Sequence, residues 1–568
     1  MKLLRWALRV ATVAIVAGAA WYWLHGPSIE QGSYLVLDVG GTYSEARPGG
    51  LLAHLVERRP SLSDFLESLR KARHDGRIAG VVVRLGHLDS GWAQAQEIRG
   101  ALALAKDAGK KIVAELETEM TPAAKEVYVA SVADAVYVAP AAAPMLTGLQ
   151  ASAVFLGGLW PKLDVAMQVE KIREYKTAGD EIGGEAMTPA HREMLDSLLD
   201  DIGEQFLKTV STARNIAAAD LEQAISKGIV RPRQLVETGL ANAVRGHEDV
   251  LAGLGSGTPV PTVSADDYAD VTPRALGLGS GPAIAVVHAS GAVGTGRSHP
   301  GGSGIGSRTI AEALADAAAD TSIAAIVLRV ASPGGSPAAS DEIWLAVREA
   351  AKKKPVVASL GDVAASGGYY LASAADRIVA APGTLTGSIG VVFFKPDVSG
   401  LLGRAGIHTE TLSRGRFSRI FDLDRSLDDE ELALVRGQLD DTYRLFLERV
   451  AAGRHRKAEE IDRVGGGRVW TGRQAFERGL VDELGTMEDA VRAAANAAGI
   501  HDSDRVKLVH FPRETGLADR LASLGASVSA RMQPEAVTRL VGLVGDDAPA
   551  LTLGPGVQAV AESVPTIE

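Results

Sequence analysis

Residues 325–360 of this 568-residue chain read AIVLRVASPGGSPAASDEIWLAVREAAKKKPVVASL. The stretch begins with a run of apolar, mostly branched residues, continues with residues in helical spacing and ends with a second apolar run. This order of strand, helix and strand predicts a βαβ unit, and successive βαβ units build a parallel sheet. We therefore expect an α/β fold around these residues.

The same order of elements occurs once more, earlier in the chain. GVVVRL (80–85) is followed by a helical pattern, AQAQEIRGALALAKDAG, and then by a second apolar run, KIVAEL (111–116). The two halves match in four blocks that keep one order and begin at Ala79 and Ala324, Tyr128 and Tyr370, Leu146 and Leu385, and Arg233 and Arg473. The offset is 245 residues in the first block and 240 in the last. This pattern indicates a tandem duplication with a parallel sheet in each half.

The N-terminal segment has the pattern of a membrane anchor. Three basic residues precede an uncharged run from Val10 to Leu24 that ends in a cluster of aromatic residues. Together with residues 6–9 the run is long enough to span a bilayer as one helix, and the positive charges place the N-terminus in the cytoplasm. The alternative is a cleaved signal peptide with its site near Ala17–Ala19. Bulky aromatic residues directly after that site favour the uncleaved anchor.

The anchor, the two copies and a stretch rich in Gly, Pro, Ser and Asp between them predict five segments. These are an anchor (1–26), a first repeat (27–254), a linker (255–281), a second repeat (282–500) and a tail (501–568). The tail has amphipathic stretches but matches nothing in the first half, so its role stays open.

Composition excludes several classes of function. The formal net charge of −11 at pH 7 argues against a nucleic-acid partner, which would need a clustered basic face. The chain has no cysteine, so thiol nucleophiles, disulfides and thiolate metal ligands are all excluded. The 12 histidines form no HExxH motif and no pair at evident ligand spacing. We therefore expect neither a metal nor a cofactor.

The two copies differ in two small-residue loops of the second copy. Ser366 and the two glycines after it stand opposite Ala124–Glu126, where the first copy has neither serine nor glycine. SPGGS (332–336) stands opposite residues 87–91, which lack the glycine pair. Either loop alone is typical of a turn or a helix N-cap. The loss of both loops from the first copy favours a functional site in the second.

These loops suit acyl transfer. Ser366 begins a helical stretch, where the first backbone N–H groups have no partner within the helix. We expect the N–H of Gly334 or Gly335 to form an oxyanion hole with the N–H of Gly367, because glycine permits the close backbone approach that such a site needs.

A serine nucleophile needs a base, and the residues alone leave two alternatives open. His288 is the only histidine near a strand of the second copy, but no motif ties it to a Ser-His-Asp order. The other alternative is a lysine that burial keeps neutral. Composition does not select one lysine from the set.

Three stretches of the second copy together resemble one known family. They are VLRVASPGGSPAASDEI (327–343), GDVAASGGYYLASAADRIVAAPGTLTGSIGVV (361–392) and GRVWTGRQAFERGLVDELG (467–485). Their order and spacing are similar to those of signal peptide peptidases of the long, membrane-anchored protease IV type. The resemblance covers the chain from about Tyr34 to about residue 500, with the duplication and the anchor included.

The resemblance implies roles for single residues and a fold for each repeat. Ser366 in the ASGG motif matches the family's nucleophile, and Lys176 in YKTA (175–178) matches its base. Ser388 in TGSIG matches the serine that hydrogen-bonds this lysine. Each repeat is expected to have a ClpP/crotonase-like fold. The chain departs from the family after YKTA, where it continues GDEIGGEAMTP, and this puts substrate preference in doubt more than the dyad.

The resemblance also implies an activity, partners and a location. We expect a serine endopeptidase with a Ser-Lys dyad that hydrolyses cleaved signal peptides and similar apolar peptides, needs no cofactor and assembles as a homotetramer. We expect it in the bacterial inner membrane, with one span and the bulk of the chain on the periplasmic side. Two alternatives are a crotonase-like acyl-CoA hydrolase or isomerase and a non-catalytic scaffold in membrane quality control.

Overall fold

The protein is seen in a computed structural model that describes residues 29–45, 61–255, 258–298, 304–513, 556–560 and 566–567. The predicted anchor (1–26) lies outside these residues. Within the described ranges, no helix has both the length and the apolar character needed to cross a membrane.

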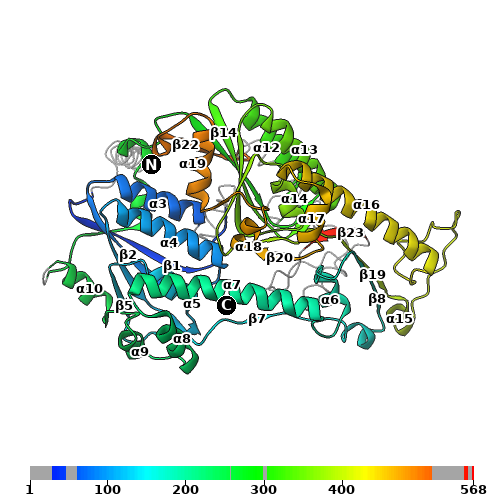
Figure 1. The fold of residues 1–568 in the computed structure, drawn as a ribbon, viewed down its shortest axis with the longest axis horizontal. Coiled ribbons are helices and arrows are strands. Elements are labelled where there is room, and N and C mark those ends of the chain that lie inside the picture. Colours follow the sequence, from blue (N-terminus) through cyan, green and yellow to red (C-terminus); the bar gives the residue numbers. More distant parts are fainter. Residues whose placement is uncertain are drawn as a thin grey trace, which may run out of the picture.

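The first repeat is built on a six-stranded parallel sheet (Figure 1). Its strands lie in the order β10-β1-β2-β3-β5-β9. The central strands are rich in valine, isoleucine and leucine and are largely buried, as a parallel sheet covered on both faces requires. The elements in chain order are β1 (Ser33–Gly41), α3 (Leu62–His74), β2 (Ile78–Leu88), α4 (Trp92–Asp107), β3 (Lys111–Leu116), α5 (Ala124–Ala130), β5 (Ala135–Val138), β9 (Ala243–Val244) and β10 (Thr262–Ser264).

The second repeat has the same arrangement, with strands in the order β22-β11-β14-β16-β17-β21. Two short strands, β18 (Leu385–Gly387) and β20 (Val469–Thr471), extend the sheet beyond the end of β16. The elements in chain order are β11 (Ala283–Ser290), α12 (Ser307–Ala319), β14 (Ile323–Ser332), α13 (Pro337–Ala351), β16 (Val356–Ala365), α14 (Gly367–Ala372), β17 (Arg377–Ala380), β21 (Glu483–Leu484) and β22 (Lys507–Phe511).

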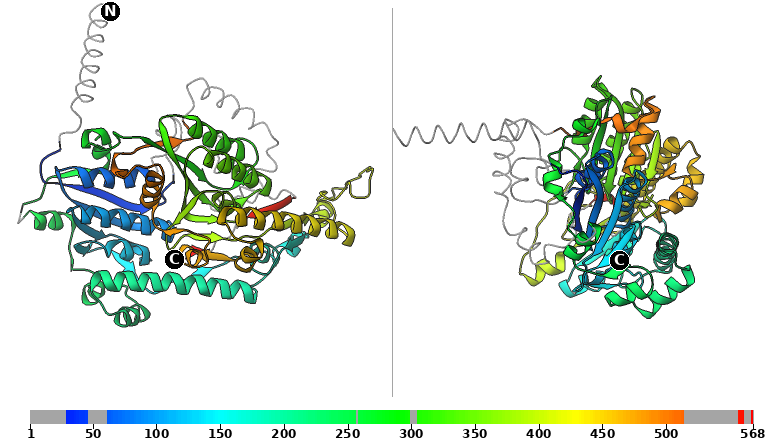
Figure 2. Two further views of the ribbon diagram at one scale, coloured as in Figure 1. Left: turned by 45° about the horizontal axis from the view of Figure 1, so that its top comes forward. Right: turned by 90° about the vertical axis from the view of Figure 1, so that its left-hand side faces the viewer.

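Further helices and strands surround the two sheets. They are β4 (Glu119–Pro122), β6 (Ala143–Met145), β7 (Ala151–Ser152), α6 (Ala178–Gly183), α7 (Pro189–Arg214), α8 (Ala218–Lys227), α9 (Pro232–Glu237), α10 (His247–Leu254), α11 (Ala265–Ala269), α15 (Ser399–Arg404), α16 (Asp429–Arg454), α17 (Ala458–Val464), α18 (Gly472–Glu477) and α19 (Met487–Ala497). Figure 2 shows the long helix α7 running beneath both repeats.

The two sheets correspond strand for strand, which confirms the predicted α/β class with a parallel sheet in each half. In each repeat the last strand returns to pair in parallel with the first, β10 with β1 and β22 with β11. Both returning strands lie beyond the repeat boundaries expected from the sequence, β10 within the predicted linker and β22 within the predicted tail. Three- and five-residue strands flanked by loops give little periodic signal. We propose that the repeats end near Ser264 and Phe511.

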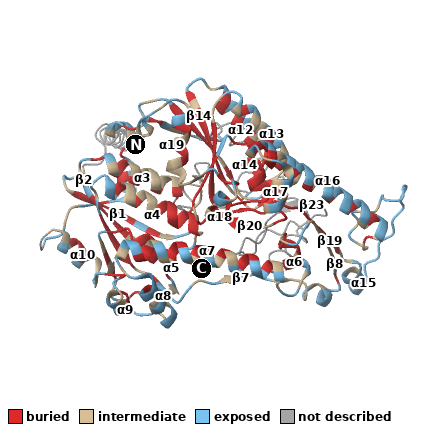
Figure 3. Cartoon of the chain, in the orientation of Figure 1, coloured by how far each residue is buried: buried red, intermediate tan, exposed pale blue. Residues whose placement is uncertain are grey.

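Each repeat has its own hydrophobic core, and the buried residues lie in both sheets and in the helices packed on them (Figure 3). Buried charges join the two repeats. Arg329 on β14 of the second repeat is 2% exposed. Its guanidinium pairs with Glu97 on α4 at 2.7 Å and with Glu45 at 2.8 Å, both from the first repeat. Asp362 of the second repeat accepts hydrogen bonds from the N–H groups of Gly91 and Gln94 at the start of α4. These contacts fix how the two repeats sit against each other.

A third sheet contains strands from both repeats. Its order is β13-β12-β15-β23-β19-β8, from β8 (Ala166–Lys171), β12 (Val293–Gly294), β13 (Ile305–Gly306), β15 (Gly334–Gly335), β19 (Val392–Asp397) and β23 (Gly556–Val560). Strand β8 of the first repeat pairs antiparallel with β19 of the second along six residues, from Lys171 opposite Val392 to Ala166 opposite Asp397. This pairing carries the segment after β8 into the second repeat.

Candidate active site

Ser366 lies at the junction between strand β16 and helix α14. Its backbone has φ 53° and ψ −118°, a region that non-glycine residues adopt only under constraint. Its N–H donates to the carbonyl of Gly387 at 2.8 Å, and its own carbonyl accepts from the N–H of Tyr370 at 2.8 Å. The strained turn therefore holds the serine at the end of a buried strand, where its side chain is fixed by the packing around it.

Lys176 reaches this serine from the other repeat. Its Nζ lies 2.8 Å from Ser366 Oγ, although 190 residues separate the two in the sequence. The lysine is 1% exposed and the serine is fully buried. Burial lowers the pKa of Lys176 to about 7, because an ammonium group taken out of water loses its hydration. A large fraction of this amine is therefore neutral near pH 7.

Ser388 lies on the other side of the lysine. Its Oγ is 3.0 Å from Lys176 Nζ, and its carbonyl oxygen is 3.2 Å from the same atom. The backbone of Ser388 also has positive φ, 50°, and its N–H donates to the Arg468 carbonyl at 2.7 Å. With these contacts the amine is surrounded by oxygen atoms at hydrogen-bond distance, which hold it towards Ser366.

The backbone of Lys176 is held by a glycine turn that the sequence analysis did not single out. Gly467 has φ +87°, and a Cβ placed there would lie 2.6 Å from Lys176 Cα. The N–H of Tyr175 donates to the carbonyl of the preceding Gly466 at 3.2 Å. The run GGG at 465–467 was the sequence signal for this close approach.

The glycine loop after β14 lies directly against the start of α14. A Cβ placed on Gly367 would be 3.1 Å from both Gly334 Cα and Gly335 N. Gly334 and Gly335 have φ of 111° and 150°, so the loop needs glycine at the first of these positions at least. The N–H of Gly334 already donates to Ser332 Oγ at 3.1 Å. Gly367 opens α14, so its N–H has no carbonyl partner earlier in that helix.

His288 and the first-repeat residues aligned with the serine loop lie away from the dyad. Nε2 of His288 is 2.9 Å from Nδ1 of His510, and burial lowers the pKa of His288 to about 3. The position opposite Gly367 in the first repeat holds buried Lys125, whose Nζ donates to the Ser90 carbonyl at 2.7 Å. The neighbouring Glu126 accepts from the N–H of Leu88. In the first repeat, polar side chains thus occupy the space that the second leaves to glycines.

An apolar wall adjoins the dyad on the side of the third sheet. Val392 and Phe394 on β19 pack with Ala178 and Ile182 on α6, the helix that begins two residues after Lys176. Trp160, Met167 and Val169 pack against this cluster. The residues that follow YKTA begin on α6, and one of them, Ile182, is part of this wall.

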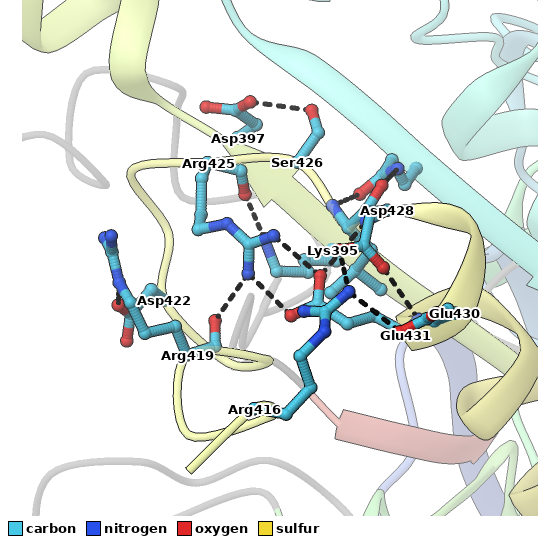
Figure 4. A network of polar contacts seen from close by, with 12 residues as sticks. Lys395, Asp397, Arg416, Arg419, Asp422, Arg425, Ser426, Asp428, Glu430 and Glu431 are labelled. Carbon is cyan, nitrogen blue, oxygen red and sulfur yellow. Dashed lines mark hydrogen bonds and ion pairs between the residues drawn. The ribbon is translucent and has the colours of Figure 1, made fainter. Parts of the chain in front are cut away.

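A polar network supports β19 from its far end (Figure 4). Lys395 is fully buried and its Nζ donates to the Arg425 carbonyl, while Arg425 pairs with Glu431 at 2.7 Å. Asp397, at the end of β19, accepts from Ser426 Oγ at 2.7 Å. The network ties the loop between α15 and α16 to the strand that forms the apolar wall.

The described residues contain no cluster of three or more His, Asp or Glu side chains that could hold a metal ion. The reactive groups at the site are the Ser366 hydroxyl, the Lys176 amine with its lowered pKa, the Ser388 hydroxyl and the backbone N–H groups of the glycine loops.

Comparison with known proteins points to one family. The family described as "Peptidase family S49" matches the chain in two segments, residues 104–258 and residues 348–501. "Serine protease SPPA, chloroplastic" of Arabidopsis thaliana is 34% identical over 548 residues, which is 94% of this chain and 78% of the relative. "Protease 4" of Salmonella typhi is 32% identical over 499 residues, 85% of this chain and 78% of the relative. "Putative signal peptide peptidase SppA" of Enterococcus faecium is 35% identical over 124 residues, 22% of this chain and 36% of the relative.

Proposed function

This chain belongs to peptidase family S49 and is a serine protease, and we propose that Ser366 is its nucleophile and Lys176 its general base. The observation that carries the proposal is the 2.8 Å separation of Lys176 Nζ and Ser366 Oγ inside the protein. The pKa of about 7 supports it, because a general base works best when its pKa lies near the working pH.

The reaction follows from the positions of these groups. Neutral Lys176 accepts the hydroxyl proton of Ser366 while Oγ bonds to the carbonyl carbon of the peptide. The oxyanion that forms is stabilised by the N–H groups of Gly335 and Gly367; Gly334 is left out because its N–H is engaged by Ser332. The protonated amine then gives its proton to the leaving nitrogen, and the C–N bond breaks. Water, deprotonated by the same amine, hydrolyses the acyl-enzyme and restores Ser366.

Ser388 has a positioning role in this proposal. Its hydroxyl and carbonyl hold the lysine at hydrogen-bond distance, so the lone pair of the neutral amine faces Ser366. A fixed orientation of this kind removes rotational freedom that the reaction would otherwise have to restrict.

Apolar peptides, cleaved signal peptides among them, are the proposed substrates. The apolar wall of Val392, Phe394, Ala178 and Ile182 beside the dyad supports this class. The named activity of the Enterococcus faecium relative points the same way. The crotonase-like and scaffold alternatives gain no support, since the relatives named here are proteases.

Four further features are part of the proposal. They are the ClpP/crotonase-like fold of each repeat, the single N-terminal span (1–26), the periplasmic location and the homotetramer. The basic residues before the uncharged run support the span and its orientation.

Turnover of a fluorogenic apolar peptide by the full-length chain in detergent tests the dyad. Ser366→Ala and Lys176→Ala are each expected to lower kcat/KM by roughly 10³–10⁴-fold while the circular dichroism spectrum stays that of the wild type. The matched controls are Ser418→Ala and Lys352→Ala, at exposed positions away from the dyad. Retained turnover in Lys176→Ala would reject the lysine as base, and retained turnover in Ser366→Ala would reject the nucleophile.

A further inference from the structure

The glycine turn at 465–467 lies directly against the segment that carries the proposed base. A Cβ on Gly467 would meet the backbone of Lys176, and the Gly466 carbonyl accepts from the N–H of Tyr175 at 3.2 Å. Gly466 and Gly467 have φ of 65° and 87°, a region that glycine enters freely. The turn has no side chains of its own, so its position depends on groups outside it.

Tyr443 on α16 supplies such a group. Its side chain is buried. The N–H of Gly466 donates to the Tyr443 hydroxyl oxygen at 3.0 Å, and this hydroxyl donates to Oδ1 of Asp462 at 2.6 Å. Burial raises the pKa of Tyr443, so the hydroxyl keeps its proton for the aspartate. It therefore accepts from the turn and donates away from it at the same time, which a phenylalanine could not do.

Asp462 on α17 continues this contact to the first repeat. Its Oδ2 pairs with the guanidinium of Arg173 at 2.5 Å. Arg173 precedes Lys176 by three residues and has φ 69°, and a Cβ on Gly466 would lie 3.4 Å from its Cβ. Helices α16 and α17 pack against each other (Figure 1). The contacts of Tyr443 thus reach the turn on one side and the lysine segment on the other.

A matching set of side chains occurs away from the turn. Tyr268 on α11 is fully buried in the core of the first repeat. Its hydroxyl donates to Asp75 at 3.2 Å, and Asp75 pairs with Arg77 at 2.8 Å. Removal of either hydroxyl takes a donor from an aspartate that also pairs with an arginine. Removal of the Tyr443 hydroxyl takes in addition the acceptor of the Gly466 N–H.

We propose that Tyr443 is a positioning residue for the reaction: its hydroxyl holds the glycine turn against the segment of Lys176 and so keeps the amine beside Ser366. The inference rests on the proposed Ser-Lys dyad. Tyr443 acts through the backbone of the turn, and the apolar wall proposed for the peptide is formed by other residues. Loss of the hydroxyl should therefore slow the chemical step and leave peptide binding as it is.

The kinetic test compares Tyr443→Phe with Tyr268→Phe in the full-length chain. A buried backbone N–H without an acceptor is costly, so the turn must shift in Tyr443→Phe. Because a misplacement of about 1 Å costs roughly 10²-fold in rate, we expect kcat for the fluorogenic peptide to fall roughly 10- to 10²-fold with KM unchanged. Tyr268→Phe should keep the wild-type kcat. Equal kcat in the two variants, or a loss that appears in KM alone, overturns the proposal.

The pH profile separates a positioning role from a general loss of stability. A lysine segment that is held less firmly admits water to the amine, and hydration moves the pKa of Lys176 from about 7 back towards 10.5. The midpoint of kcat/KM should therefore rise by roughly one pH unit in Tyr443→Phe and stay at the wild-type value in Tyr268→Phe. A midpoint that does not move in Tyr443→Phe would show that the amine has kept its place and would overturn the proposal.

Amide hydrogen exchange tests the inference without any turnover. Peptides that cover residues 173–178 and 465–468 should exchange roughly tenfold faster in Tyr443→Phe than in the wild type, and at the wild-type rate in Tyr268→Phe. Equal exchange in both variants contradicts the proposed role of Tyr443. The turnover of Lys176→Ala decides the proposed function separately. Faster exchange in Tyr443→Phe beside an active Lys176→Ala would mean that Tyr443 holds the turn but that the base, and with it the positioning role, is wrongly assigned.

Discussion

At the scale of single residues, the site depends on two unfavourable features that the surrounding structure holds in place. Ser366 has a backbone conformation that a serine rarely adopts, and Lys176 is a lysine taken almost wholly out of water. The second feature sets the chemistry. An amine with its ordinary pKa of 10.5 would be protonated at pH 7 and could not accept the proton of Ser366.

The pH dependence of the reaction follows from Lys176. The neutral amine is the active form, and burial lowers its pKa to about 7, so kcat/KM should rise with pH and level off above about pH 8. Below the midpoint the rate should fall about tenfold for each pH unit. Initial rates between pH 5 and 9 at low peptide concentration measure the profile. A flat profile, or one that falls across this range, would contradict the assignment of the base.

The same lysine should cost the protein stability. Its folded pKa is lowered from 10.5 to about 7, so between these pH values the unfolded chain binds a proton that the folded chain does not. Stability therefore rises with pH across this window. Lys176→Met should abolish activity yet raise the free energy of unfolding at pH 7 by about 1–3 kcal/mol. Urea unfolding at pH 7 and pH 9 checks this, with Ser366→Ala as the inactive control. A free energy of unfolding for Lys176→Met at pH 7 that is equal to or below that of the wild type would show that burial of the amine does not destabilise the folded protein.

At the scale of elements, the antiparallel pairing of β8 with β19 determines where Lys176 lies. The pairing brings the end of β8 to the second repeat, and the glycine turn at 465–467 receives the backbone that follows. Because Gly467 leaves no room for a Cβ against Lys176 Cα, this turn fixes the position of the lysine more tightly than side-chain contacts alone.

Gly467→Ala should displace the lysine without unfolding the chain. The added Cβ meets the Lys176 backbone at a residue with φ +87°, so the turn must shift. A displacement of about 1 Å costs roughly 10²-fold in rate, and we expect a loss of that order in kcat. Gly437→Ala is the matched control, since a Cβ there has nothing within 4 Å. Full activity in Gly467→Ala would show that the turn tolerates the shift.

At the scale of the whole molecule, the dyad exists only while the two repeats keep their relative position. Arg329 pairs with Glu97 and Glu45 across the interface between the repeats and is nearly inaccessible to water. Arg84, its counterpart 245 residues earlier in the first repeat, is one-third exposed and pairs with Glu117 and Asp38 of its own repeat. The two arginines therefore form a natural matched pair.

Arg329→Met should destabilise the protein much more than Arg84→Met. The first change leaves carboxylates buried without a cation and is expected to cost about 3–5 kcal/mol. The second removes partly exposed ion pairs, for which about 0–1 kcal/mol is expected. Thermal and urea unfolding of both variants give the comparison. Similar losses in the two variants would mean that Arg329 does not hold the repeats together.

The sequence by itself determined the α/β class, the duplication and the identity of the loops that differ between the copies. Hydrophobic periodicity, glycine positions and internal matches are local or directly comparable along the chain, so they can be read without coordinates. The resemblance to a known family supplied Lys176 and Ser388, which periodicity and composition could not select from the other lysines and serines.

The tertiary structure alone decided what depends on contacts between distant segments. The sequence does not show that β8 pairs with β19, that Gly467 lies against Lys176, or that Arg329 meets Glu97. Nor does it show that β10 and β22 close their sheets or that β23 pairs with both β15 and β19, since short strands owe their conformation to their neighbours. The depressed pKa of Lys176 belongs to the same class, because burial is a property of the folded chain and not of the residue.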